Sequence, residues 1–104
     1  MTDSMVVLCT CGNVGEAERI AAALVEERFA ACVNILPPIR SLYRWKGNVE
    51  TAEEMPLLIK TTGERFPALQ QRILQLHSYE VPEIIALPIV AGLEKYLVWL
   101  REQV

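Results

Sequence analysis

The residues best suited to chemistry in this chain lie close together in one segment, residues 77–83. The segment begins with His77, the single histidine of the sequence, and also contains Glu80 and Glu83. Imidazole and carboxylate groups are common metal ligands, so these three side chains are candidate ligands of a metal ion. The alternative for His77 is a hydrogen-bonded surface residue at the end of the preceding helix, where the helix dipole favours an imidazolium.

Cys9 and Cys11 are separated by one residue at the end of an apolar run that predicts a strand. Alternate side chains of a strand lie on the same side, so the two thiols face the same way. Thiolates favour copper(I) and zinc, which makes Cys9 a further candidate metal ligand. The alternative is that cysteine serves here as a small apolar residue of a buried strand, and for Cys32 we expect that role. Three cysteines, an odd number, fit a reducing compartment better than a disulfide framework.

Several classes of protein are disfavoured by the sequence. It lacks a glycine-rich phosphate loop and the G-x-S-x-G, H-E-x-x-H and C-x-x-C motifs, and one histidine cannot form a multi-histidine metal cage within one subunit, although sites can assemble between subunits. We therefore expect neither enzymatic activity nor an organic cofactor. A net charge of −3 with scattered basic residues argues against nucleic acid as a partner. The longest apolar stretch, residues 84–93, is too short to span a membrane.

The hydrophobic pattern predicts one α+β domain that covers residues 1–104. We expect strands at 5–10, 30–36, 39–46, 49–61 and 83–90, and helices opened by capping boxes at 13–16 and 61–64, followed by a last amphipathic helix at 93–104. The strand at 5–10 has the continuous apolar character of a strand buried on both faces, and Glu16 is expected outside the apolar face of its helix. The order βαββαβ plus a C-terminal helix is typical of the ferredoxin-like sandwich. Pro88 places the last strand at an edge of the sheet or at a bulge.

A long central hairpin, with its turn expected at 47–48, carries the remaining candidate residues. Tyr43 and Trp45 share one face of its first strand, and its arms exceed what a small domain needs. We therefore expect the hairpin to protrude and the two aromatic residues to line a subunit interface rather than the core. Lys60 follows a run of apolar residues and needs an acidic partner or an anionic ligand. The candidate partners are Glu50, Glu53, Glu54 and Glu83.

Taken in order, several motifs resemble those of the CutA divalent-cation tolerance proteins. The matching segments are 6–10, 30–35, 41–47, Glu54, 59–61, 77–83 and 96–99. The resemblance implies a ferredoxin-like fold, a tight homotrimer, cytoplasmic residence, and an association with copper and other divalent ions. It matches Cys9 to a cysteine that is linked to copper in the family, and His77 to a family histidine. Leu76 replaces a second histidine present in some members, and Ser78 replaces a common proline, which implies weaker metal binding.

The leading interpretation is a homotrimeric, copper-binding protein of divalent-cation tolerance. Its metal ligands would be His77 and Cys9, with Glu80 or Glu83 as oxygen ligands. The alternative is a trimeric module, similar to the PII signalling proteins, that senses a small ligand or anchors a partner protein without any metal. The cleft of that module would be lined by Tyr43, Trp45, Glu54, Lys60, Tyr79 and Glu83, and Lys60 would favour a small anion.

Overall fold

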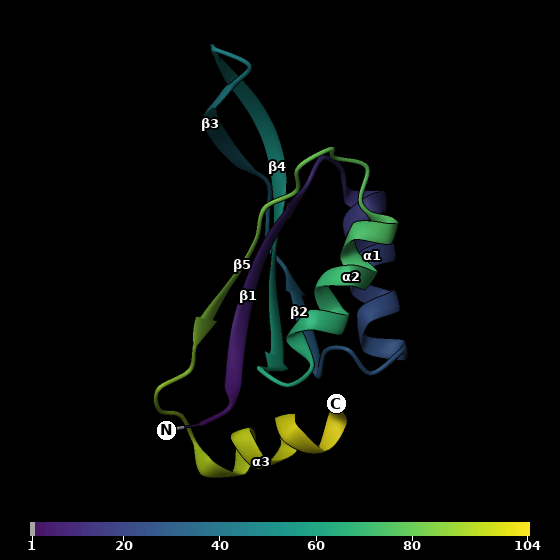
Figure 1. Ribbon diagram of the computed structural model, residues 1–104, viewed down its shortest axis with the longest axis vertical. Helices are drawn as coiled ribbons and strands as arrows, with labels where there is room; N and C mark the ends of the chain where they lie inside the picture. The colour runs from purple at the N-terminus through teal and green to yellow at the C-terminus, as the bar shows by residue number, and fades with distance from the viewer. Residues whose placement is uncertain (1) are drawn as a thin grey trace.

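The computed structural model describes residues 2–104, which form five strands and three helices (Figure 1). In chain order these are β1 (Ser4–Cys11), α1 (Val14–Glu26), β2 (Cys32–Ile35), β3 (Ile39–Trp45), β4 (Asn48–Thr62), α2 (Phe66–Leu76), β5 (Ile84–Pro88) and α3 (Glu94–Gln103). The expected order of elements and the ferredoxin-like α+β fold are confirmed. No helix in this part of the chain is long and apolar enough to cross a membrane.

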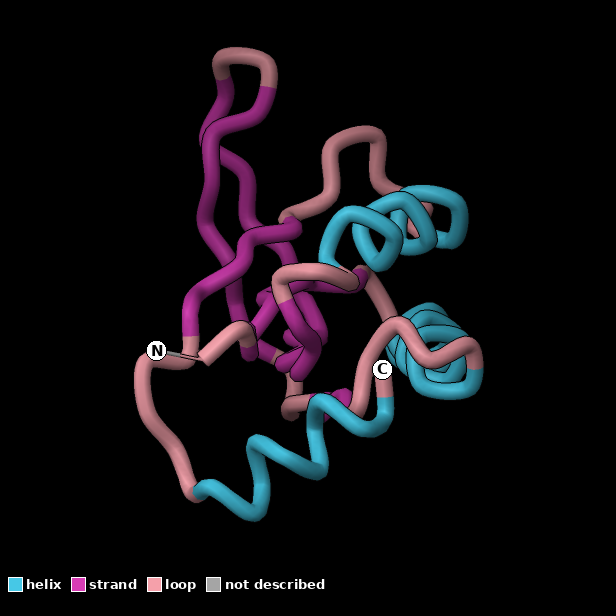
Figure 2. The backbone as a smooth tube through the Cα atoms, turned by 60° about the horizontal axis from the view of Figure 1, so that its bottom comes forward, coloured by secondary structure: helices cyan, strands magenta, loops and turns pink. Residues whose placement is uncertain are grey.

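All neighbouring strands of the sheet are antiparallel, in the order β2-β4-β1-β5, while β3 pairs with the outer half of β4. Figures 1 and 2 show α1 and α2 side by side on one face of the sheet and α3 separate from them near its lower end. β5 pairs only with β1 among the described residues, and Pro88 is its last residue. The prediction of an edge strand at Pro88 is therefore confirmed.

The core lies between the sheet and the pair α1 and α2. In β1 the buried side chains include Val7, Cys9 and Cys11, whereas the intervening Val6 and Leu8 are half-buried. The expectation that this strand is buried on both faces is wrong for the single chain, because the helices cover only one of its faces. The remaining members of the core cluster are Ala17, Ile20, Leu24, Ala30, Met55, Leu57, Ile59, Leu69 and Ile73.

The two predicted capping boxes have different outcomes. At α1, Oδ1 of Asn13 accepts a hydrogen bond from the N–H of Glu16 at 2.8 Å, so the predicted N-cap is confirmed. The Glu16 side chain is buried rather than exposed, because it turns toward the end of α2 instead of facing solvent. At α2 the expected capping box is wrong: the helix begins after Arg65 without a side-chain cap, while Thr62 accepts from the N–H of Arg65 in the preceding turn.

The β3–β4 hairpin extends beyond the rest of the molecule (Figure 1). Its strands pair from Ile39 with Glu54 to Trp45 with Asn48, so the turn consists of Lys46 and Gly47, one residue earlier than predicted. Both turn residues have positive φ, 50° and 85°, as a two-residue type I′ turn requires. Apolar side chains on this hairpin face solvent in the single chain, since Leu42 and Val49 are each 67% exposed.

The turn gives a first testable prediction. Gly47→Ala should lower the free energy of unfolding by about 1–2 kcal/mol, because a Cβ disfavours the left-handed region. A Cβ at Gly47 would meet no atom within 4 Å, so the loss comes from backbone conformation alone. Urea unfolding at a fixed protein concentration measures this change in the free energy of unfolding. Lys46→Ala is the matched control and should change stability by less than about 0.5 kcal/mol, since it retains a Cβ. Equal stability of both variants would contradict the assignment.

Candidate functional site

His77 lies where α2 ends, and its backbone N–H still donates to the carbonyl of Ile73 at 2.8 Å. The chain then becomes extended, and the imidazole is buried, with only 9% of the residue exposed. Nε2 lies 2.7 Å from the carbonyl oxygen of Thr10, to which it donates as an N–H. The N–H of Tyr79 lies 3.1 Å from Nδ1 and donates to it when that nitrogen is unprotonated. His77 therefore ends a helix as predicted, but it is a fixed interior residue rather than a surface cap.

Glu16 is the buried carboxylate behind this imidazole. Its Oε1 lies 3.2 Å from Nδ1 of His77 and accepts a hydrogen bond from the N–H of Ser78 at 3.2 Å. Burial acts to raise the pKa of Glu16, but the hydrogen bonds from Ser78 and the charge of His77 outweigh it and hold the pKa below its usual value. Sequence reasoning missed this residue, because a glutamate in the first turn of a helix is usually explained by the helix dipole.

Cys9, Cys11 and His77 form a buried cluster in which one ligand atom from each residue lies within 4.8 Å of the others. The neighbouring thiol of Cys11, together with burial, raises the pKa of Cys9, whose Sγ donates a long hydrogen bond to the carbonyl of Thr10 at 3.9 Å. The interaction with Cys9 lowers the pKa of Cys11, although burial opposes it. Of the two sulfurs, the thiolate is thus favoured at Cys11, and the thiolate is the form in which cysteine binds metals.

The spacing of the cluster fits a thiophilic metal. Metal–sulfur and metal–nitrogen bonds of about 2.3 and about 2.0 Å place two sulfurs and one nitrogen about 3.5–3.8 Å apart in tetrahedral geometry. The three ligand atoms lie within 4.8 Å of one another, so they would need to move only about 1 Å closer together to bind a metal ion. The carboxylate of Glu16 lies beside Nδ1 of His77. In many metal sites a carboxylate in this position orients a histidine that binds the metal through its other ring nitrogen. Cys32, expected in the core, is half-buried on β2 and does not belong to this cluster.

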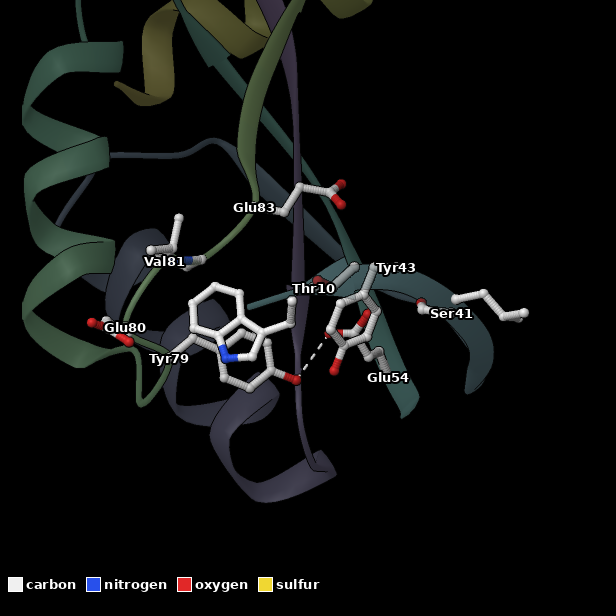
Figure 3. Close-up of a pocket in the computed structure, with 11 residues that line it drawn as sticks. Thr10, Ser41, Tyr43, Glu54, Tyr79, Glu80, Val81 and Glu83 are labelled. Carbon is white, nitrogen blue, oxygen red and sulfur yellow. Dashed lines mark hydrogen bonds between the residues drawn. The ribbon is translucent and has the colours of Figure 1, made fainter. Parts of the chain in front are cut away.

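A cavity of about 600 Å³ lies beside this cluster, between the hairpin and the segment after α2, and its lining residue Tyr79 has its ring 4.7 Å from the imidazole of His77. Its lining residues are Thr10, Ser41, Leu42, Tyr43, Trp45, Glu54, Tyr79, Glu80, Val81, Pro82 and Glu83. The hydroxyl of Tyr79 donates to Oε2 of Glu54 at 2.9 Å, as the dashed line in Figure 3 marks. Burial, followed by the hydrogen bond to Glu54, raises the pKa of Tyr79, so its hydroxyl remains a donor.

The structure distributes the sequence-predicted residues over these two places. Cys9 and His77 meet in the buried cluster, whereas Glu80 and Glu83 line the cavity with Tyr43, Trp45, Glu54 and Tyr79. Lys60 does not line it. Its Nζ donates to Oδ1 of Asn34, and it forms no ion pair with an acidic residue within residues 2–104. The expected acidic partner is absent because Lys60 is half-exposed on the sheet face opposite the buried Ile59 and Thr61.

The fold and the two places together define a small ferredoxin-like α+β protein with a buried sulfur–imidazole cluster. The family model described as "CutA1 divalent ion tolerance protein" matches residues 5–103, and the chain belongs to this family.

Similar proteins cover most of the chain. A "Divalent-cation tolerance protein CutA" of Thermus thermophilus is 56% identical over 97 residues, which are 93% of this chain and 94% of that protein. "Protein CutA" of Homo sapiens is 47% identical over 89% of this chain, which spans only 52% of the human protein. Among solved structures, a divalent cation tolerance protein of Thermus thermophilus superposes with a TM-score of 0.95 at 54% identity, covering 96% of this chain and 97% of that one. The Xylella fastidiosa CutA gives 0.93 at 43% identity, covering 95% of each chain.

Proposed function

We propose that this chain is a homotrimeric metal-binding protein of divalent-cation tolerance, with copper as its preferred ion. The family and the names of its relatives support the tolerance role. The observation that carries the metal proposal is the cluster of Cys9, Cys11 and His77, whose ligand atoms lie within 4.8 Å of one another. Two sulfurs and one imidazole favour a soft ion over a hard one such as Mg²⁺ or Ca²⁺.

Each residue of the cluster has a distinct part in this proposal. Cys9 and Cys11 supply thiolates, and a metal that binds them displaces their protons. His77 supplies Nε2, which first gives up its hydrogen bond to the carbonyl of Thr10. Glu16 keeps the ring oriented through Nδ1. Glu80 and Glu83 lie in the cavity lining, so we propose a metal site made without them.

Metal titration of the chelator-stripped chain tests the proposal. Under anaerobic conditions and against a competing chelator, we expect one copper(I) to bind per chain, more tightly than zinc(II). Cys9→Ser, Cys11→Ser and His77→Ala should each weaken binding by at least about 10–100-fold, since even changes of residues that only orient ligands have effects of this size.

The third cysteine provides the matched control for this titration. Cys32→Ser removes a thiol outside the cluster and should leave the affinity unchanged. Copper binding that survives in the Cys9 and His77 variants, or that is lost equally in Cys32→Ser, would contradict the named ligands.

The trimer is a separate part of the proposal, supported by apolar surface that the single chain leaves exposed. This surface includes Leu42 and Val49 on the hairpin, Ile85 and Leu87 on β5, and Tyr96 and Trp99 on α3. β5 also has a free edge within the described residues, and free edges favour pairing with another chain. Sedimentation at micromolar concentration should give three times the 11.7 kDa mass of the chain. A monomer under these conditions would overturn this part.

A further inference from the structure

We propose that the cavity beneath the hairpin binds a small organic cation, with an ammonium or guanidinium head on a short apolar body. This inference goes beyond the metal-tolerance function and depends on different side chains. Its three components are the buried carboxylate of Glu54, the aromatic lining, and the absence of basic residues from that lining.

Glu54 is the anchor of the proposed site. Only 8% of the residue is exposed, yet it forms no ion pair with any lysine, arginine or histidine in the described residues 2–104. Its Oε2 accepts a hydrogen bond from Tyr79, and no described residue donates to Oε1. Oε1 is not among the buried polar atoms that lack a partner, so it is open to the cavity that Glu54 lines. The free oxygen is therefore the natural acceptor for a charged N–H group of a ligand.

Three aromatic residues complete the lining around this carboxylate. Tyr43 and Trp45 come from β3, and Tyr79 comes from the segment after α2. Figure 3 shows the hydroxyl of Tyr79 pointing toward the carboxylate of Glu54, with the side chain of Tyr43 nearby. Aromatic faces attract ammonium and guanidinium groups, and Trp45 already has Nζ of Lys46 at 5.6 Å from its ring centroid. The aromatic rings and the carboxylate thus both favour a ligand with an ammonium or guanidinium group.

The charge of the lining excludes the small anion that Lys60 suggested. Among the described residues the lining itself contains Glu54, Glu80 and Glu83 but no lysine or arginine, although Nζ of Lys46 lies over the ring of Trp45. A hard divalent ion fits less well, because it needs about six oxygen ligands. In Figure 3 the carboxylate of Glu80 lies on the far side of Tyr79 from Glu54. A volume of about 600 Å³ is that of a small-molecule site rather than of a single ion.

Fluorescence titration with a matched pair of probes tests this proposal. The chain has two tryptophans, so Trp99→Phe leaves Trp45 as the only indole, and it lines the cavity. Benzylammonium should change its fluorescence saturably at millimolar concentrations. Benzyl alcohol has nearly the same shape without the charge and should bind at least about 10-fold more weakly, since hydrogen bonds to charged groups are the stronger ones. Absence of saturation, or equal binding of both probes, would overturn the proposal.

Variants of neighbouring glutamates separate the anchor from general surface charge. Glu54→Gln should weaken benzylammonium binding at least about 10-fold, whereas Glu53→Gln, on the exposed neighbour in β4, should leave it unchanged. If Glu54→Gln fails to give a folded circular dichroism spectrum, Tyr43→Leu on the exposed hairpin tests the same site and should weaken binding. Unchanged binding in a folded Glu54→Gln variant, or an equal loss in Glu53→Gln, would overturn the assignment.

Discussion

Glu16→Ala is expected to destabilise the metal-free protein by about 1–3 kcal/mol, the cost of leaving a buried hydrogen-bonding group without its partner. Glu16 is 4% exposed, and its Oε1 serves both the N–H of Ser78 and Nδ1 of His77. An alanine leaves the buried N–H of Ser78 without this acceptor and removes the carboxylate beside His77. Urea unfolding at a fixed protein concentration measures the loss, because the stability of an oligomer depends on concentration.

Two further variants make the Glu16 experiment specific. Glu18→Ala, on the exposed side of α1, should change stability by less than about 0.5 kcal/mol. Glu16→Gln should fall between wild type and Glu16→Ala, because its amide oxygen can still accept from Ser78. A loss in Glu16→Ala no larger than in Glu18→Ala would contradict the role of this carboxylate.

The same carboxylate predicts an acid dependence of stability. The pKa of Glu16 is lower in the folded state than in the unfolded chain, so its ionised form stabilises the fold. That contribution is fully present above the unfolded pKa of about 4.3 and is lost as the pH falls through the lower folded pKa. The stability gap between wild type and Glu16→Gln should therefore be larger at neutral pH than at about pH 3. An equal gap at both values would refute this prediction.

Ile59→Ala is the second change with a large expected effect, a loss of about 2–5 kcal/mol. Ile59 is 0% exposed in the middle of β4, where it is paired with Val7 of β1 and Val33 of β2. Strands on both sides restrict how far the backbone can close the cavity that alanine leaves. Ile59→Val, which removes a single methylene, should lose only about 0.5–1.5 kcal/mol. Equal losses in the two variants would mean that the site is less tightly packed than the structure shows.

The fold was accessible from local sequence patterns, because those patterns act over a few residues. Pro88 indicated an edge strand, and Asn13 with Glu16 indicated the start of α1. The turn was displaced by one residue, since Lys46 adopts a positive φ that its side chain does not predict. The expectation that both faces of β1 are buried was wrong for the single chain, because an apolar run does not reveal that the helices cover only one face.

The candidate site was only partly accessible, because its contacts join distant parts of the chain. The spacing of Cys9 and Cys11 predicted that their thiols share a side, which their common burial confirms. No local pattern indicated that His77 lies beside them, or that Glu16 lies behind its ring, since 61 or more residues separate these groups in sequence. Lys60 was misjudged for a related reason: apolar neighbours indicate a strand, but alternation places every second side chain on its open face.

X-ray absorption at the copper edge of the copper(I)-loaded protein, in a Cys32→Ser background, tests the central claim most directly. The account predicts a first shell of two sulfurs and one imidazole nitrogen, supplied by Cys9, Cys11 and His77. Cys9→Ser should reduce the sulfur count to one. A first shell of nitrogen and oxygen alone, or a spectrum that Cys9→Ser leaves unchanged, would contradict the account.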